Sequence, residues 1–411
     1  MTISWDCFDT LVTRRKFDPL SVFDDMGAKL GLADFTQRRK AAESRAPWTL
    51  SAIYEELAKD YGWSDAKKEH YKALEIEAEL EHCCPIAENL SQVKDGDLIV
   101  SDMYLPAEAI EKILRKNGLS ADVQIFVSTG GKSSGHIWSS LPPIDLHIGD
   151  NPHSDVASPQ AHGIHAMRYM GVFPTWLEKE MGGDLGLLMR VVRLANPYTD
   201  ASALHGLLGQ MWLEQSHYNI PALILAALEI PENNVAFVQR DCVHLQRIHE
   251  AIHGATNAAF HCSRIALAEG GEQWREYVES TAHGKIIVDL QGTGGSIRSY
   301  WMHAFQEEPD LLYVTGTLPQ GRLLVHCLHD AIERFNSSPL GSLAKFPERK
   351  RNEYDPLVLE CQKQAVDCAI GHIPYFSFPP SLDRLQRLVS LMPDSVTVKL
   401  NKHIDNHMGV E

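Results

Sequence analysis

Residues 4–14 read SWDCFDTLVTR, a short β-prone run that stops at a carboxylate, Asp6, and is followed by a second aspartate, Asp9. A run of this kind is typical of a buried strand that delivers a polar side chain at its carboxyl end. The same design recurs in DGDLIVSD (95–102), VQIFVS (123–128) and IDLHIGD (144–150). The repeated pattern predicts a parallel sheet whose polar strand ends gather in one crevice.

The segments between these strands have helical patterns, which sets the predicted fold class. Residues 106–119 and 133–141 lie between the last three strands. The gap between the first and second strands is too long for a simple crossover. Helical patterns recur in this gap at 19–32, 35–46, 50–62 and 66–83. We therefore predict an α/β, Rossmann-like parallel sheet with a helical cap inserted at about 17–95.

A second α/β domain is predicted further along the chain. Its strands are expected at 234–239, 257–262, 285–290 and 311–318, with helices at 241–253 and 294–305. The Pro-rich tail beyond about 340 is expected to be irregular. The predicted domains are a catalytic core at 1–172, a linker at 173–199 and a second α/β domain at 200–411.

The polar strand ends of the first domain suit phosphoryl transfer to a carboxylate. Such a site needs an attacking aspartate, carboxylates for a metal ion, and hydroxyl and cationic groups for the phosphate oxygens. Asp6 is the predicted nucleophile, Ser101 the hydroxyl donor and Lys132 the cation. Asp150 and Asp155 are the predicted metal carboxylates, and Mg²⁺ suits oxygen ligands of this kind.

Four segments, taken in order, resemble the motifs of the haloacid dehalogenase superfamily: FDTLVTR, SDMYLP, KSSG and IGDNPHSD. They are most similar to a branch of predicted hydrolases whose first motif reads FDxFDTL. The resemblance covers roughly residues 1–170. It implies a Mg²⁺-dependent phosphatase in which Asp6 forms the phosphoaspartate. It also implies that the backbone carbonyl of Phe8 joins Asp6, Asp150 and Asp155 as a metal ligand, and that the cap sets substrate specificity.

Phe8 departs from that resemblance, because most phosphatases of the superfamily carry a second aspartate at this position. Asp9 would face the opposite way in an extended strand, and we expect it to fix the loop or contact the cap. Loss of the acid predicts a slow enzyme, or a leaving group that needs no proton. Haloacid dehalogenases also have an aromatic residue here, but GDNPHSD (149–155) suits a metal and a phosphate better than an organohalide.

In the second domain, KIIVDLQGTGGSIRSYW (285–301) predicts a strand, a Gly-rich turn and the start of a helix. Backbone N–H groups at a helix start can cradle an anion. The turn resembles the phosphate loop of type I phosphoribosyltransferases, although only Asp289 is present of the usual acidic pair. A tight turn that serves packing is the alternative. The predicted phosphate-binding residues are Thr293, Gly294, Gly295 and Ser296.

The formal net charge of −16 argues against general nucleic-acid or anionic-membrane binding. No apolar run approaches a membrane span, no signal segment is recognisable, and the eight cysteines lack metal-ligand spacing. A cytoplasmic protein with reduced thiols is therefore expected, and the sequence does not indicate an oligomeric state. The leading hypothesis is a phosphohydrolase for a small phosphorylated metabolite. The alternatives are a phosphate-sensing regulatory protein and a bifunctional enzyme with phosphoribosyl chemistry in its second domain.

Overall fold

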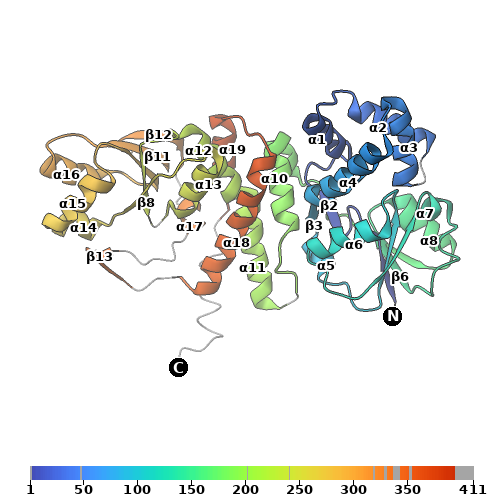
Figure 1. Ribbon diagram of the computed structural model, residues 1–411. Helices are drawn as coiled ribbons and strands as arrows, with labels where there is room; N and C mark the ends of the chain where they lie inside the picture. The colour runs from blue at the N-terminus through green and yellow to red at the C-terminus, as the bar shows by residue number, and fades with distance from the viewer. Residues whose placement is uncertain are drawn as a thin grey trace. The chain divides into compact units, whose positions relative to one another are not determined.

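The computed structural model describes residues 2–46, 49–200, 202–239, 241–317, 320–327, 331–336, 343–350 and 354–393. The chain divides into two compact units, Met1–Thr175 and Trp176–Glu411. Each unit is built on a five-stranded sheet with helices packed against it (Figure 1). The predicted α/β fold class is confirmed.

The sheet of the first unit is entirely parallel, in the order β5-β4-β1-β6-β7. After β1 the chain adds strands on one side and then returns to place β6 on the other side of β1. The carboxyl ends of β1 and β6 therefore meet at the topological switch point, where such sheets bind ligands. The strands are β1 (Ile3–Trp5), β4 (Leu98–Asp102), β5 (Gln124–Ser128), β6 (Leu146–Gly149) and β7 (His165–Arg168).

The elements between these strands confirm one predicted helix and correct another. α6 (Ala107–Lys116) is a full crossover helix. The helix predicted at 133–141 is wrong, because α7 (Gly131–Ser134) ends at Gly135, whose left-handed φ of 86° stops the helix. A π-helical segment, η1 (Pro152–Ala157), and α8 (Ser158–Ala161) follow β6.

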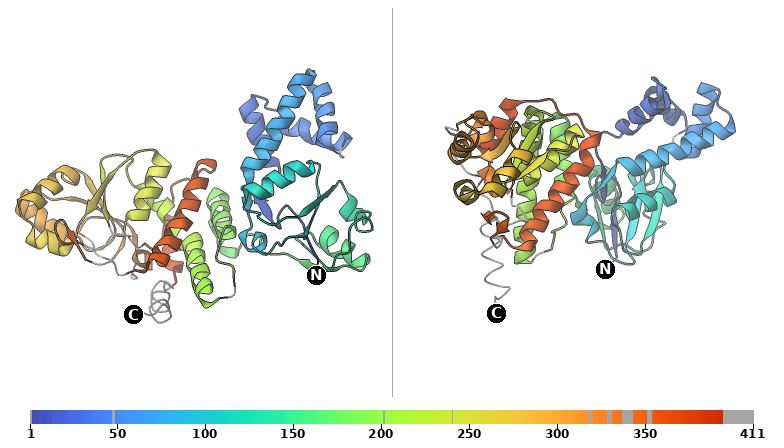
Figure 2. Two further views of the ribbon diagram at one scale, coloured as in Figure 1. Left: turned by 60° about the horizontal axis from the view of Figure 1, so that its bottom comes forward. Right: turned by 60° about the vertical axis from the view of Figure 1, so that its left-hand side comes forward.

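The predicted cap helices are confirmed, and their apolar sides share one core with the sheet. Figure 2 shows them, in blue, grouped at one end of the first unit. The cap joins the sheet through an antiparallel pair of strands that we did not predict, β2 (Val12–Arg14) and β3 (Cys83–Pro85). A short helix, α5 (Ala87–Leu90), leads back to β4. The cap helices are α1 (Leu20–Leu30), α2 (Phe35–Arg45), α3 (Leu50–Tyr61) and α4 (Asp65–His82).

The second unit has another parallel sheet, in the order β12-β11-β10-β8-β9, so its switch point lies between β8 and β10. The predicted strands are confirmed in the described residues, and β12 was not predicted. Leu318, at the end of the strand predicted at 311–318, lies outside the described residues. The strands are β8 (Val235–Gln239), β9 (Ala258–His261), β10 (Ile286–Gln291), β11 (Asp310–Gly316) and β12 (Arg322–His326).

Both faces of this sheet are buried, because alternate side chains along each strand enter different cores. Val288 and Leu290 pack with α12 (Ile220–Glu229) and α13 (Val243–His253), whereas Ile287 enters an aromatic core with Trp274 and Trp301. These tryptophans come from α15 (Glu272–Thr281) and α16 (Gly295–Ala304).

Two regions, one predicted as a linker and the other as an irregular tail, are helical. The predicted linker contains α9 (Trp176–Met181) and α10 (Gly183–Leu194), and α10 packs into the core of the second unit. The tail contains α18 (Pro356–His372) and α19 (Leu382–Leu391), where Pro356 occupies the first helical turn and so starts the helix rather than breaking it. The remaining elements are α11 (Ala203–Glu214), η2 (Gln215–Asn219), α14 (Arg264–Glu269), α17 (Ala331–Arg334), η3 (Ile373–Tyr375), β13 (Leu343–Lys345) and β14 (Glu348–Arg349).

In the part of the chain that the structure describes, no helix is both long and apolar enough to span a bilayer. All eight cysteines are free thiols.

Candidate active site at the carboxyl ends of β1 and β6

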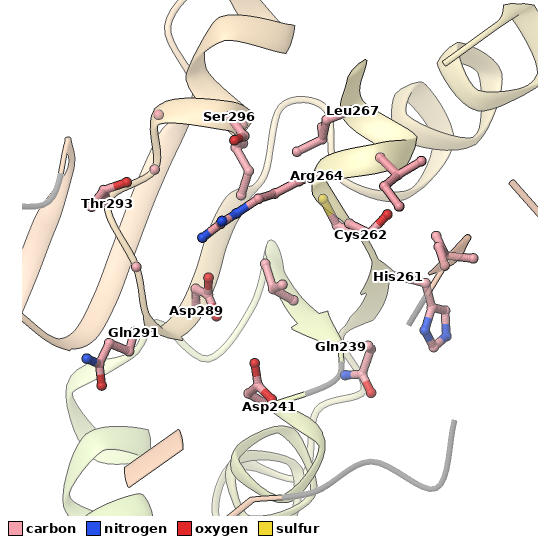
Figure 3. Close-up of a pocket in the computed structure, with 18 of the residues that line it drawn as sticks. Gln239, Asp241, His261, Cys262, Arg264, Leu267, Asp289, Gln291, Thr293 and Ser296 are labelled. Atoms are coloured by element: carbon pink, nitrogen blue, oxygen red, sulfur yellow. The ribbon is translucent and has the colours of Figure 1, made fainter. Parts of the chain in front are cut away.

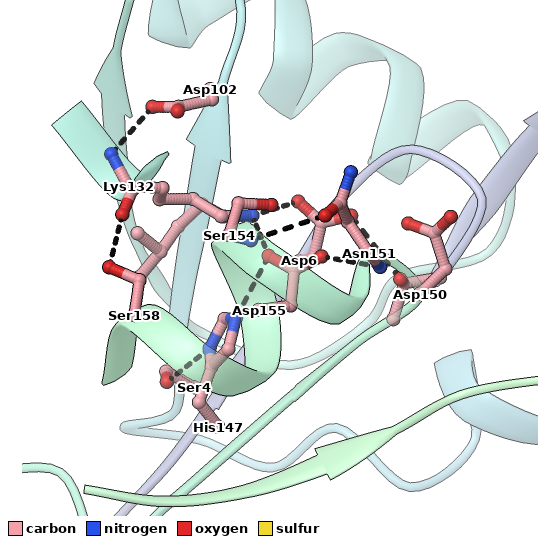
Figure 4. Close-up of polar contacts among 12 residues, drawn as sticks. Ser4, Asp6, Asp102, Lys132, His147, Asp150, Asn151, Ser154, Asp155 and Ser158 are labelled. Carbon is pink, nitrogen blue, oxygen red and sulfur yellow. Dashed lines mark hydrogen bonds and ion pairs between the residues drawn. The ribbon is translucent and has the colours of Figure 1, made fainter. Parts of the chain in front are cut away.

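A buried lysine bridges the predicted nucleophile Asp6 and the predicted metal carboxylate Asp155 (Figure 4). The Lys132 ammonium lies 2.5 Å from Asp6 Oδ1 and 2.6 Å from Asp155 Oδ1, and it donates to the Val100 carbonyl at 3.1 Å. Its side chain is only 2 % exposed. A buried cation of this kind persists only with matched partners, so the sequence-predicted trio of Asp6, Lys132 and Asp155 forms one ionic cluster.

Asp6 follows β1 directly, and its backbone position is fixed by a hydrogen bond from its N–H to the Ile148 carbonyl of β6 at 2.8 Å. Its second carboxylate oxygen, Oδ2, accepts a hydrogen bond from the Thr10 hydroxyl at 3.2 Å. Both carboxylate oxygens are thus held in place. Sequence reasoning missed Thr10, because residues 6–10 form a turn and not a helix, so a spacing of four residues carried no signal.

The loop after β6 carries the other acidic residues. Asn151 caps η1 by accepting the N–H groups of His153 and Ser154, and its own N–H donates to Asp155 Oδ2 at 2.9 Å. The side chain of Asp155 lies so close to Gly149 that a Cβ there would stand 2.5 Å from Asp155 Cγ. The loop therefore folds Asp155 back over the end of β6.

Asp102, which sequence reasoning missed, anchors the loop that carries Lys132. Its carboxylate accepts the Lys132 N–H at 2.9 Å and the Ser133 N–H at 3.2 Å, and it also accepts the Ser128 hydroxyl. The signal for this role was its place directly after Ser101 at the end of β4. Ser101 itself is buried at that strand end, and its hydroxyl has no hydrogen-bond partner among the described residues.

Behind Asp155 lies His147, which is fully buried in β6. Burial lowers the pKa of His147, which favours the neutral ring. The Ser4 hydroxyl lies 2.8 Å from Nδ1 of the ring, and Nε2 lies 3.4 Å from Asp155 Oδ1. Because an ionised carboxylate can only accept a hydrogen bond, we assign the ring proton to Nε2, and Nδ1 then accepts the Ser4 hydroxyl. Ser4 and His147 therefore form a chain of polar contacts that ends on Asp155 and helps to orient its carboxylate.

The cluster holds more negative charge than Lys132 can balance. Burial raises the pKa of Asp6 to about 7, and Asp155 and Asp150 add to this rise while Lys132 opposes it. Burial, Asp9 and Asp155 raise the pKa of Asp150 to about 6. Burial disfavours ionised Asp155 as well, but His147 and Lys132 outweigh burial and lower its pKa. Burial is thus the main cause of the raised pKa values of Asp6 and Asp150, and the neighbouring carboxylates add to it.

A metal ion fits this arrangement. Asp6, Asp150 and Asp155 each present one carboxylate oxygen, and the three oxygens lie within 4.8 Å of one another. Hard oxygen ligands in this number suit Mg²⁺, which keeps water in its remaining positions. The three carboxylates predicted from the sequence are therefore brought together, and the Phe8 carbonyl stays a predicted further ligand.

The structure corrects the expected geometry around Phe8 and Asp9. Asp9 does not lie in an extended strand; it adopts a left-handed turn with φ of 59°, and its presence contributes to the raised pKa of Asp150. Its carboxylate accepts the Thr13 hydroxyl at 2.6 Å, which confirms the predicted loop-fixing role. The Phe8 ring packs under the Arg14 guanidinium, 4.5 Å from the ring centroid. Arg14 in turn pairs with buried Glu79 of the cap at 2.8 Å.

The predicted phosphate-binding residues of the second unit, Thr293 to Ser296, lie between β10 and the start of α16. They border a cavity of about 510 Å³ (Figure 3). The predicted strand, Gly-rich turn and helix are all present. No family model matches this chain, and no curated protein is detectably similar to it.

Proposed function

We propose that the first unit is a Mg²⁺-dependent phosphohydrolase that acts on a small phosphorylated metabolite through an aspartyl phosphate on Asp6. The observation that carries this proposal is the convergence of three carboxylates and one buried ammonium group on the end of β1. Bound Mg²⁺ would be held by Asp6, Asp150 and Asp155 and would neutralise phosphate oxygens. The eight free thiols suit a reducing compartment, and we propose a cytoplasmic enzyme.

In the first step the Asp6 carboxylate attacks phosphorus, and the bond from phosphorus to the leaving oxygen breaks. Thr10 holds Asp6 Oδ2 while Lys132 holds Oδ1, so the carboxylate is oriented before substrate arrives. The Lys132 ammonium is also placed to stabilise negative charge that develops on the transferred phosphoryl group. The Ser101 hydroxyl, which has no partner among the described residues, is a further donor.

In the second step a water molecule attacks phosphorus, the bond to Asp6 breaks, and inorganic phosphate leaves with Asp6 restored. Phe8 supplies no proton to the leaving oxygen in the first step and no base for the water in the second. We therefore propose that good substrates carry leaving groups that are stable as anions. General acid and base help contributes about 10²- to 10⁴-fold in rate, so turnover of simple alkyl phosphates is expected to be slow.

A regulatory protein that binds a phosphorylated ligand is the second candidate. The observation that favours it is the packing of Phe8 under Arg14, which fills the place of a proton donor with an aromatic ring. A bifunctional enzyme is a further alternative, and pyrophosphate chemistry with phosphoribosyl pyrophosphate that survives loss of Asp6 would identify it.

The test is phosphate release from an aryl phosphate, whose leaving group needs no proton, with Mg²⁺ and with chelator. Asp6→Asn removes the nucleophile, and Asp122→Asn is a matched control at an exposed position of the same unit. We expect metal-dependent release by the parent protein and the control, and none by Asp6→Asn. Release that persists in Asp6→Asn would refute the nucleophile. Mg²⁺ binding with no release by the parent protein would favour the regulatory role.

A further inference from the structure

Asp150 is held differently from the other two carboxylates of the candidate metal site. Asp6 and Asp155 both pair with Lys132, and each accepts a further hydrogen bond. The carboxylate of Asp150 has no hydrogen-bond or ion-pair partner from another residue in the part of the chain that the structure describes. Its direction therefore depends on the backbone that carries it. Residues that fix this backbone support the metal ligand without binding the metal themselves.

Arg168, the last residue of β7, supplies such support. Its Nε donates a hydrogen bond to the backbone carbonyl of Asp150 at 2.8 Å. Gly149 and Arg168 are also direct partners in the ladder of β6 and β7, and the N–H of Tyr169 donates to the Gly149 carbonyl at 2.8 Å. The Arg168 side chain is exposed and forms no ion pair with another described residue. Two successive carbonyls at the start of the metal loop are therefore held by the end of β7 and the residue that follows it.

The same guanidinium group contacts an aromatic pair. It lies over the ring of Phe173, 5.7 Å from the ring centroid, which is a cation–π geometry. Phe173 meets Phe17 edge to face, with ring centroids 6.4 Å apart and ring planes at 80°. Edge-to-face packing of this kind is favourable for aromatic rings. These contacts form a continuous path from the backbone of Asp150 to Phe17.

Phe17 lies in the connection through which the chain enters the cap. This connection runs from Arg14, at the end of β2, to Leu20, at the start of α1. Phe17 has φ of 63°, a left-handed backbone that is rare for a bulky residue and persists only where its surroundings hold it. The ring contact with Phe173 is one such restraint, so the path from the metal loop ends on a strained residue of the cap connection.

The returning side of the cap is tied to the same segment. The Tyr169 hydroxyl donates to Glu88 Oε1 at 2.5 Å, and Glu88 lies in α5, shortly after β3. Gly171 makes room for this contact, because a Cβ there would stand 2.4 Å from the Tyr169 hydroxyl oxygen. Residues 168–173 therefore contact the metal loop and both connections of the cap.

We propose that Arg168 is a positioning residue for Asp150, and that Phe173 and Phe17 couple the metal site to the cap connection. The inference rests on the proposed function, because it takes Asp150 as a ligand of Mg²⁺. While the cap connection holds Phe17 against Phe173, the guanidinium group stays on the Asp150 carbonyl, and the carboxylate keeps its place beside the other two. A shift of the connection loosens the metal ligand. Metal binding in turn restrains the connection, because coupling between two sites is reciprocal.

The test is calorimetric titration of the full chain with Mg²⁺ in the absence of substrate, so that binding is measured apart from turnover. Arg168→Met removes the hydrogen bond to Asp150 and is expected to weaken Mg²⁺ binding about tenfold. The sign is informative, because loss of a nearby positive charge would by itself strengthen the binding of a cation. Lys94→Met removes the same charge from an exposed position before β4, at the opposite end of the sheet, and should change the affinity less than about twofold.

Two further measurements test the coupling to the cap. Phe17→Leu is expected to weaken Mg²⁺ binding about threefold in the parent chain. It should have no effect in a chain that already carries Arg168→Met, because residues that act through one another are not additive. Mg²⁺ is also expected to slow hydrogen exchange in a peptide that covers residues 15–21, in the parent chain and in Lys94→Met but not in Arg168→Met.

The outcomes separate this inference from the proposed function. Unchanged or tighter Mg²⁺ binding in Arg168→Met overturns the positioning role. Equal effects of Phe17→Leu in the presence and absence of Arg168 overturn the coupling to the cap. A parent chain that binds no Mg²⁺ overturns both this inference and the metal site of the proposed function. Phosphate release is assayed separately, so Mg²⁺ binding without release counts against the hydrolase activity alone.

Discussion

Lys132→Met is expected to destabilise the first unit strongly, because it removes the cation shared by Asp6 and Asp155. Methionine keeps most of the length of the side chain and loses the charge. Both carboxylates remain in place, and their side chains are 10 % and 1 % exposed. Removing one partner of a buried ion pair costs about 3–5 kcal/mol, because the remaining charge is left uncompensated.

Hydrogen exchange measured by mass spectrometry can localise this loss to one unit. A decrease of that size in opening free energy makes exchange about 10²- to 10⁴-fold faster where exchange follows unfolding. The effect is expected in peptides that cover β1 and β4, while a peptide that covers β10 in the second unit serves as an internal control. Lys112→Met, at an exposed position of α6, is the matched control variant.

Mg²⁺ is expected to recover part of the protection lost in Lys132→Met, since a bound cation replaces the missing charge. Asp155→Asn in the same chain should also recover part of it, by removing one of the carboxylates left unpaired. Protection of β1 that changes less than tenfold in Lys132→Met would refute the view that this lysine is the structural counterion of the cluster. Phosphate release from the aryl phosphate should fall about 10²-fold or more in the same variant.

Three other changes test separate parts of the structure. Gly149→Ala places a Cβ 2.5 Å from Asp155 Cγ and should therefore displace this carboxylate. The Mg²⁺ concentration for half-maximal activity should rise about 10- to 100-fold. An unchanged concentration would contradict the tight contact. Phe8→Asp should speed release from alkyl phosphates more than release from aryl phosphates, because only the alkyl leaving group needs a proton while the water step is common to both. The gain should be less than about 10²-fold because nearby Arg14 favours the ionised form of the new acid. No gain with alkyl phosphates would argue against a proton-transfer role. Burial, with a smaller effect of Arg247, lowers the pKa of His244 to about 3, so the stabilising effect of the neutral ring is full above about pH 6.5 and falls as the pH drops. In denaturant titrations the free energy of unfolding of the second unit should fall by about 2 kcal/mol by pH 5. This loss should be absent in His244→Leu and retained in the exposed control His70→Gln.

The strands of both sheets were largely predictable because apolar runs that stop at polar residues mark buried parallel strands. The same rule fails at β7, whose His165–Arg168 segment is mostly exposed and lacks a continuous apolar run. Residues 133–141 show the opposite error. Their pattern indicates a helix, but the left-handed backbone at Gly135 ends α7 after one turn. The prolines beyond residue 340 favour an irregular tail, but Pro356 stands at the start of α18, because proline is also a common first residue of a helix.

The members of the acidic cluster could be named from the sequence because each lies at or just after the end of a predicted strand. Lys132 could be named as the cation of the site, but its ion pairs with Asp6 and Asp155 could not. Lys132 and Asp6 are 126 positions apart in the chain, and only the folded sheet shows that their side chains meet. The turn at Asp9 was also hidden, since an aspartate tolerates both extended and left-handed backbone.

The stem formed by β2 and β3 makes the cap an interchangeable module. Arg14 and Cys83 are direct partners across this antiparallel ladder, so the cap leaves and re-enters the core at neighbouring points. None of the carboxylates of the acidic cluster, nor Lys132, comes from the intervening segment. A two-residue turn of the kind that closes hairpins could join the stem strands directly. The cap can therefore differ in length or sequence while the three carboxylates and Lys132 keep their places.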